Sequence, residues 1–149
     1  YMILTMDKKE TLIIYLAAVQ FLRTHSMTTG KVGVVGFCWG GGMANQLAVN
    51  DPQLSAAVPF YGRQPDAEDV PKIRASLLLH YAGLDERINE GIPAYEAALK
   101  AAGIDYKMYV YDGAQHAFNN DTNAARYNKD AAQLAWKRTS SFLTEKLKQ

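Results

Sequence analysis

Residues 32–47, with the sequence VGVVGFCWGGGMANQL, decide the expected fold of this chain. A short apolar run at the start of this stretch predicts a β-strand, and apolar residues near its end recur at helical spacing. Cys38 lies between the two, with Gly36 and Gly40 two residues away on either side. Because glycine has no Cβ, this spacing predicts a sharp strand-to-helix turn that lifts the Cys38 side chain out of the carboxyl end of a sheet.

Cys38 is therefore expected to stand exposed at a helix N-terminus. The peptide dipoles and free N–H groups at that end of a helix favour the thiolate over the thiol, and the thiolate is the nucleophilic form. A buried structural cysteine is the alternative interpretation, because free cysteine also packs as a small hydrophobic side chain. The rest of the chain has to distinguish a reactive Cys38 from a structural one.

Length and composition predict a single domain over residues 1–149. A hydrophobic content of 48% and an aromatic content of 11% favour a packed core over disorder. Sixteen basic and fifteen acidic residues give a net charge of +1, and no long charge run indicates a nucleic-acid or membrane partner. The expected partner is a small molecule, and neither a cofactor nor a metal is predicted.

The number of cysteines predicts the compartment of the protein, and the first residues of the chain predict whether its domain is complete. One cysteine cannot form an internal disulfide, and no signal-peptide pattern is visible, so we expect a reducing cytoplasm. No apolar stretch approaches the roughly 20 residues that span a bilayer. The chain begins with Tyr1, shortly before an amphipathic pattern. We therefore expect an incomplete domain that starts inside its architecture.

Hydrophobic periodicity predicts strands that alternate with helices, after an initial helix. The expected strands are 31–36, 56–61, 76–82 and 105–111, the last of them nearer a sheet edge. Helices are expected over 7–25, from Cys38 to about Val49, around Tyr95, and over 122–148, while 63–74 reads as a loop with room for one helical turn. This alternation predicts an α/β fold with a mostly parallel sheet covered by helices on both faces.

Two helices carry specific apolar lines. In the first, we expect Leu12, Leu16 and Val19 to face the core, with Ile13 and Phe21 widening that face. In the last, the expected apolar line consists of Trp136, Leu143 and Leu147.

Three reactive residues follow the expected strands at their carboxyl ends, where functional groups gather in such sheets. They are Cys38, Asp85 and His116, and a nucleophile, an acid and a histidine in this chain order are typical of α/β-hydrolases. His116 can take the thiol proton, and Asp85 can hold the imidazole tautomer. The backbone N–H of Trp39 can face a developing oxyanion.

Each of these residues also has a structural interpretation. Asp85 could cap the next helix, and His116 could be an ordinary surface histidine, but three such residues in the correct order favour a site. Glu86 is the nearest rival to Asp85. Asp112 also ends a strand but lies too close to His116 to suit the order.

Other candidates are weaker as members of a site. His80 falls inside a strand and is expected in the core or in support of the site, and His25 is expected to be solvated. Tyr61 and Arg63 follow the second strand and could line a substrate pocket. They could equally be an interface tyrosine and a solvated arginine.

Three motifs together resemble the dienelactone hydrolase family over nearly the whole chain. They are GFCWGG at 36–41, the strand-G-x-D arrangement at 77–85, and GAQHAF at 113–118. The resemblance implies a cysteine hydrolase of the α/β-hydrolase fold, with Cys38 as nucleophile, His116 as base and Asp85 as the orienting acid. Family members open cyclic enol lactones such as carboxymethylenebutenolide to an open-chain acid.

The chain departs from the family pattern in two ways. The family places several strands, an acidic residue, a substrate-binding arginine and the loop with the second oxyanion donor before the first helix of this chain. The best-studied members also carry an arginine four residues after the histidine, where this chain has Asn120, and Arg126 is not at the matching position. Loss of a guanidinium that could grip a carboxylate leaves the substrate class open.

The leading hypothesis is a hydrolase of a small-molecule ester or lactone that acts through an acyl-cysteine. The second is a C-terminal portion that is inactive alone and associates with itself or with a missing N-terminal half. A third uses Cys38 as a redox or conjugation thiol, although the chain has no second cysteine to resolve a sulfenic acid.

Overall fold

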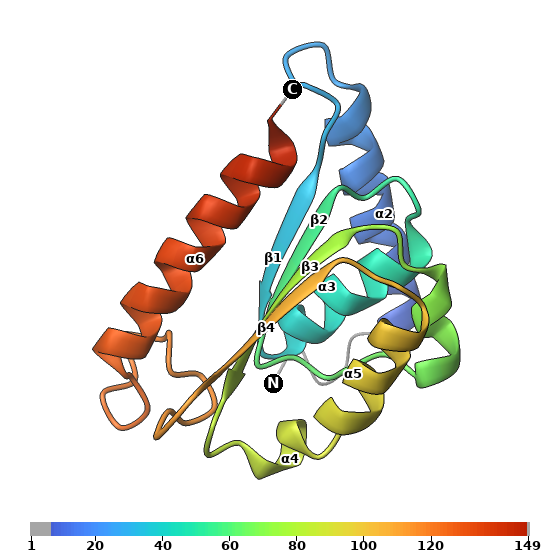
Figure 1. Ribbon diagram of the computed structural model, residues 1–149. Helices are drawn as coiled ribbons and strands as arrows, with labels where there is room; N and C mark the ends of the chain where they lie inside the picture. The colour runs from blue at the N-terminus through green and yellow to red at the C-terminus, as the bar shows by residue number, and fades with distance from the viewer. Residues whose placement is uncertain (1–6, 149) are drawn as a thin grey trace.

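The computed structural model describes residues 7–148, which form a four-stranded sheet between layers of helices (Figure 1). The strands are β1 (Gly33–Phe37), β2 (Ala56–Phe60), β3 (Ser76–Ala82) and β4 (Tyr106–Tyr111). They lie in the order β1-β2-β3-β4, and every neighbouring pair is parallel. The predicted α/β class with a parallel sheet is confirmed.

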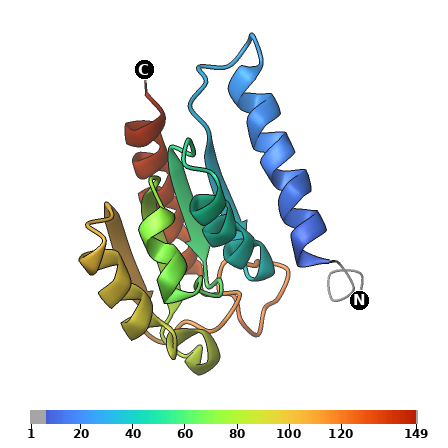
Figure 2. The same ribbon diagram turned by 90° about the vertical axis from the view of Figure 1, so that its right-hand side faces the viewer.

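The helices cover both faces of this sheet. They are α2 (Lys8–Thr24), α3 (Trp39–Asn50), the 3-10 helix η1 (Ala67–Lys72), α4 (Glu86–Asn89), α5 (Ile92–Ala101) and α6 (Lys129–Leu147). Figure 2 shows α2, α3 and α5 on the near side of the sheet, with α6 behind it. None of the helices within residues 7–148 has both the length and the apolar character that crossing a membrane requires.

The sheet separates two hydrophobic clusters. Leu77 and Leu79 of β3 belong to the cluster under α3 and α5, whereas Leu78 belongs to the cluster under α6. This division follows from the strand pleat, which points successive side chains to opposite faces. Strands β2 and β3 are buried on both faces because helices cover both.

Helix α2 only partly matches its predicted apolar face. Val19 is buried, and Leu12 and Leu16 are half-buried against the core. The prediction for Ile13 and Phe21 is wrong, since these side chains are 65% and 63% exposed. The reason is that α2 packs against α3 along a narrow face, which leaves its remaining apolar residues outside the contact.

Strand β1 is only partly buried. It spans Gly33–Phe37 rather than 31–36, and Gly33, Val34 and Val35 are only half-buried. Among residues 7–148, no strand pairs with its outer side, so β1 is one edge of the sheet and β4 is the other. The edge position predicted for the fourth strand is confirmed.

The last helix begins later than predicted. Residues 112–128 form successive turns, and α6 starts only at Lys129. Asn128 is its N-cap, and the Asn128 side chain accepts a hydrogen bond from the Ala131 N–H at 3.1 Å. Asparagine side chains compete with the helix for backbone hydrogen bonds, so they favour turns and caps over helix interiors.

The predicted apolar line on this helix is also partly wrong. Leu143 and Leu147 pack against the core, but Trp136 is 52% exposed. The buried face of α6 consists mainly of small residues such as Ala131 and Ala135. Phe142 adds one large side chain to this buried face.

Candidate active site

Cys38 occupies the turn between β1 and α3. Its backbone has φ 55° and ψ −118°, which non-glycine residues rarely adopt, and its N–H donates to the Phe60 carbonyl oxygen at 3.0 Å. A Cβ on Gly36 would lie 2.0 Å from the Gly40 carbonyl oxygen, so the close approach of strand and helix requires glycine at position 36. Cys38 is exposed, which excludes a buried core cysteine.

The structure brings Cys38, His116 and Asp85 together from three separate segments. His116 Nε2 lies 3.0 Å from Cys38 Sγ. His116 Nδ1 is hydrogen-bonded to Asp85 Oδ2, and Asp85 is buried, with an exposed fraction of 7%. A carboxylate can only accept, so Nδ1 carries the proton and the lone pair of Nε2 faces the sulfur.

This arrangement has the elements of an activated nucleophile. The imidazole can accept the thiol proton, and the carboxylate can orient the ring and stabilise its charged form. The Trp39 N–H belongs to the first turn of α3, where backbone donors have no partner within the helix. A developing negative charge beside Cys38 can therefore be met by this N–H group.

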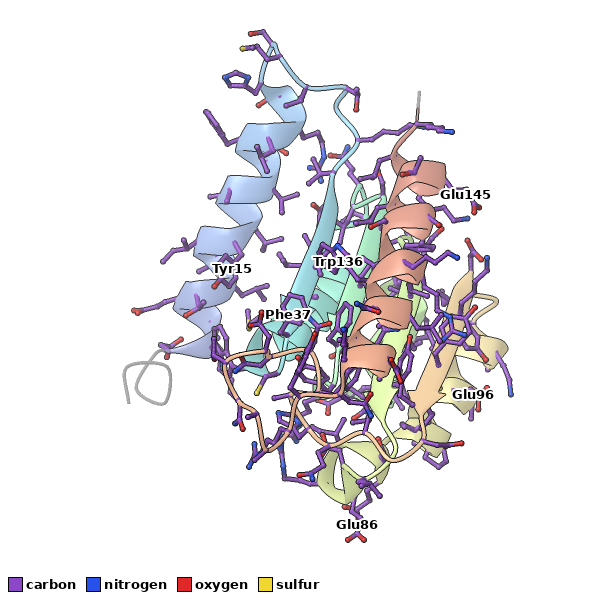
Figure 3. The ribbon with its side chains drawn as sticks, turned by 90° about the vertical axis from the view of Figure 1, so that its left-hand side faces the viewer. Tyr15, Phe37, Glu86, Glu96, Trp136 and Glu145 are labelled. Atoms are coloured by element: carbon purple, nitrogen blue, oxygen red, sulfur yellow. The ribbon has the colours of Figure 1, made fainter. Side chains whose placement is uncertain are left out.

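The rival acids lie outside this constellation. Glu86 is the first residue of α4 and is exposed, and Figure 3 shows its side chain extending away from the molecule. Asp112 directly follows β4 and is also exposed. Within residues 7–148, the only carboxylate hydrogen-bonded to the His116 ring is that of Asp85.

His80 belongs to a buried hydrogen-bonded chain below the site. Thr139 Oγ1 donates to the Ala135 carbonyl oxygen, so it accepts from His80 Nε2 at 3.1 Å. His80 Nδ1 then accepts from the Tyr111 hydroxyl at 2.9 Å. Burial, with a smaller effect of the Arg138 charge, lowers the pKa of His80 to about 3. His80 is therefore a neutral core residue whose two ring nitrogens bond Thr139 and Tyr111.

Tyr61 lies directly beside the imidazole of His116. The two ring centroids are 5.1 Å apart, and Tyr61 is 2% exposed. Its φ of 38° is rare for a residue with a side chain, and its N–H donates to the His80 carbonyl oxygen at 2.7 Å. Burial raises the pKa of the Tyr61 hydroxyl to about 12, against the opposing effect of a backbone hydrogen bond from Asn119. The hydroxyl thus stays protonated at neutral pH.

A cavity of about 560 Å³ opens beside Cys38 and His116. Tyr61 and Arg63, the two residues considered for a pocket wall, both line it. Among residues 7–148, no group of three histidine, cysteine or acidic side chains is placed to hold a metal ion.

Several cavity residues were missed in the sequence. They include Lys8, Lys9, Gln64 and Arg87. Arg87 had a usable signal, since it lies two residues after Asp85 at the carboxyl end of a predicted strand. Lys8 and Lys9 had no such signal, because a pair of basic residues at the start of a helix is usually exposed to solvent.

The remaining candidates lie away from the large cavity. Asn120 lines a second, smaller cavity of about 310 Å³, which shares Cys38 and Tyr61 with the first. Arg126 and His25 are exposed and line neither cavity.

A parallel sheet with a cysteine on a strand-to-helix turn, and with an acid and a histidine on later loops, is an α/β-hydrolase fold. Residues 2–147 match the model of the dienelactone hydrolase family. The chain belongs to this family.

Relatives of the chain carry names that agree with this family. The chain is 39% identical, over 143 residues, to a Saccharolobus solfataricus protein assigned as a carboxymethylenebutenolidase, covering 95% of this chain and 55% of that protein. It is 38% identical to Protein usf of Aquifex pyrophilus over 147 residues, covering 95% and 62% of the two chains.

Solved structures give the same result. A crystal structure from Klebsiella pneumoniae subsp. pneumoniae, assigned as a dienelactone hydrolase, superposes with a TM-score of 0.85 at 26% identity. The match covers 95% of this chain and 63% of that one. The chain thus spans less than two thirds of the length of each of these three relatives.

The glycine contacts at the Cys38 turn predict that two alanine substitutions differ in their effect on the stability of the fold. Gly36→Ala should destabilise the fold by about 1–3 kcal/mol or more, because its Cβ would overlap the Gly40 backbone. Gly40→Ala is the matched control, since a Cβ there meets no atom of the described residues within 4 Å. Thermal unfolding measures both, and equal losses would contradict this account of the turn.

Proposed function

We propose that the protein is a cysteine-dependent hydrolase that cleaves a small-molecule ester or lactone. The observation that carries this proposal is the 3.0 Å separation of Cys38 Sγ and His116 Nε2, with His116 held through Nδ1 by Asp85. The names of the relatives support the reaction class, since a carboxymethylenebutenolidase hydrolyses a lactone.

The first half of the proposed reaction acylates Cys38. His116 Nε2 takes the thiol proton, and the sulfur attacks the carbonyl carbon of the substrate. The carbonyl oxygen gains a negative charge that the Trp39 N–H can stabilise. Collapse of this intermediate breaks the bond to the leaving oxygen, which receives the proton from His116 and leaves an acyl-cysteine.

The second half releases the acid. His116 takes a proton from a water molecule, whose oxygen attacks the acyl carbon. The bond between carbon and sulfur then breaks, and the proton on His116 returns to the sulfur. Asp85 remains a carboxylate throughout, because its role is to orient the imidazole and to stabilise its charged form.

Removal of the nucleophile should abolish this route. In a preparation that hydrolyses p-nitrophenyl acetate, Cys38→Ala should lower kcat by about 10³-fold or more, because no acyl-cysteine can form. Cys38→Ser should also be strongly impaired, since a hydroxyl is far harder to deprotonate than a thiol. Retention of most of the activity by Cys38→Ala would disprove the assignment.

Paired amide substitutions test which acid orients the histidine. Asp85→Asn should lower kcat by about 10²- to 10⁴-fold with the fold intact, because the amide favours the wrong imidazole tautomer. Glu86→Gln should change kcat by less than about twofold, since surface substitutions remote from the reacting groups have small effects. If the same esterase assay showed a larger loss of kcat in Glu86→Gln than in Asp85→Asn, the orienting acid would be Glu86.

We also propose that further polypeptide covers one side of this domain, supplied by the same chain or by a second copy. Two observations support this idea: β1 is an open sheet edge among the described residues, and α2 exposes Ile13, Ile14 and Phe21 beside it. Figure 3 faces this side, with β1 lying between α2 and α6. Unpaired strand edges and exposed apolar residues favour association.

Purified residues 1–149 should therefore associate or aggregate, and should hydrolyse esters poorly. Phe21→Lys should reduce the particle size in light scattering, because a charge on the exposed apolar face opposes its burial. Leu134→Lys on α6 is the matched control, since Leu134 is also exposed but lies on the opposite layer. A stable monomer with ordinary esterase activity would contradict the proposal.

A further inference from the structure

Tyr61 combines a strained backbone with a buried side chain. Its φ of 38° lies in the left-handed region, and its side chain is only 2% exposed. Glycine adopts this region freely, whereas a residue with a side chain is strained there. A tyrosine at such a position therefore indicates that the side chain itself is required.

The backbone of Tyr61 is held from two neighbouring elements. Its N–H donates to the carbonyl oxygen of His80 in β3 at 2.7 Å. The next residue, Gly62, packs so closely on Gly41 of α3 that a Cβ on Gly62 would lie 2.2 Å from the Gly41 carbonyl carbon. These contacts fix the point from which the Tyr61 side chain extends.

The Tyr61 side chain contacts the segment that carries the proposed base at three points. Its ring centroid lies 5.1 Å from that of His116, with the two planes tilted by 58°. It also lies 5.3 Å from the ring of Phe118, in an edge-on arrangement. The Tyr61 hydroxyl accepts a hydrogen bond from the Asn119 N–H. One side chain thus packs along residues 116–119.

The His116 ring depends on such packing for its orientation. His116 lies in the run of turns between β4 and α6, outside any strand or helix. Its hydrogen bond to Asp85 holds Nδ1, but one hydrogen bond leaves the tilt of a ring free. The Tyr61 ring restricts this tilt, so that Nε2 stays directed at Cys38 Sγ, 3.0 Å away.

We propose that Tyr61 is a positioning residue, which holds His116 in the orientation from which it takes the Cys38 proton. This inference rests on the proposed hydrolase function. The aromatic ring orients the imidazole, and the hydroxyl fixes the backbone that follows it. Because Tyr61 acts through His116, its removal should lower kcat and leave KM nearly unchanged.

Alkylation of Cys38 by iodoacetamide tests this role without requiring turnover. The thiolate displaces iodide, and mass spectrometry follows the reaction directly because Cys38 is the single cysteine of the chain. At neutral pH, Tyr61→Leu should lower the alkylation rate by about 10-fold, since a displaced imidazole no longer favours the thiolate. Tyr61→Phe keeps the ring and loses only the hydroxyl, so the rate should fall by about 2- to 3-fold.

Two control variants remove similar groups away from His116. Phe142→Leu removes a buried ring of the same hydrophobic cluster, and Tyr81→Phe removes a buried hydroxyl on the other face of the sheet. Both should leave the alkylation rate unchanged, whatever they do to the temperature of unfolding. An equal loss of rate in Phe142→Leu and Tyr61→Leu would overturn the positioning role.

A double-mutant cycle with His116→Gln separates positioning from a general structural effect. His116→Gln alone should lower the alkylation rate, and Tyr61→Leu should cause no further loss in that background, because the residue through which it acts is gone. The same fold-loss in both backgrounds would overturn the inference. If Tyr61→Leu does not fold, the cycle is run with Tyr61→Phe and judged in the same way.

The outcomes distinguish this inference from the proposed function. A normal rate in Tyr61→Leu, together with a reduced rate in His116→Gln, would overturn only the role of Tyr61. A normal rate in His116→Gln would contradict activation of Cys38 by His116, and with it both proposals. In a preparation that hydrolyses p-nitrophenyl acetate, Tyr61→Leu should lower kcat by about 10- to 100-fold, as expected for a misplaced catalytic group. A rise in KM with unchanged kcat would instead indicate that Tyr61 only binds substrate.

Discussion

The close contact between the first strand and the helix after it determines most of this site. A Cβ on Gly36 would collide with the Gly40 backbone, and Gly41 of α3 and Gly62 after β2 leave no space for a Cβ on either residue. A Cβ on Gly62 would lie 2.2 Å from the Gly41 carbonyl carbon. Because of these contacts, α3 packs closely against the ends of β1 and β2. Cys38 therefore lies outside the sheet, and Tyr61 lines the same cavity.

The buried chain of hydrogen bonds through His80 joins β4, which precedes the loop that carries His116, to α6, which follows that loop. Tyr111 is the last residue of β4, just before this loop, and Thr139 and Arg138 lie in α6, after it. Arg138 donates to the Tyr111 hydroxyl at 3.1 Å, so every donor in the chain points the same way. Because His80 stays neutral, it can accept from one partner while donating to the other.

Backbone strain is concentrated where the chemistry is proposed. Within residues 7–148, the non-glycine residues with positive φ are Cys38, Tyr61 and Ala117, which is adjacent to His116. Such conformations cost about 1–3 kcal/mol each and persist where the surroundings enforce them. Here the enforcing contacts are the glycine packing, the hydrogen bond from Tyr61 to His80, and the packing of the Tyr61 and Phe118 rings, 5.3 Å apart. The same structure that stabilises the fold therefore holds these three residues in place.

The sequence by itself determined the order of strands and helices and the order of Cys38, Asp85 and His116, because strand ends and glycine spacing are local features. Only the tertiary structure decided the features that depend on which surfaces pack against each other. The exposure of Phe21 and Trp136 and the half-burial of β1 follow from which neighbours are present. The wall of the large cavity is of the same kind, because Asn45 and Gln64 hold the backbone segments that carry Arg63 and Arg87. Sequence spacing cannot report such contacts, since they join residues that only folding brings together.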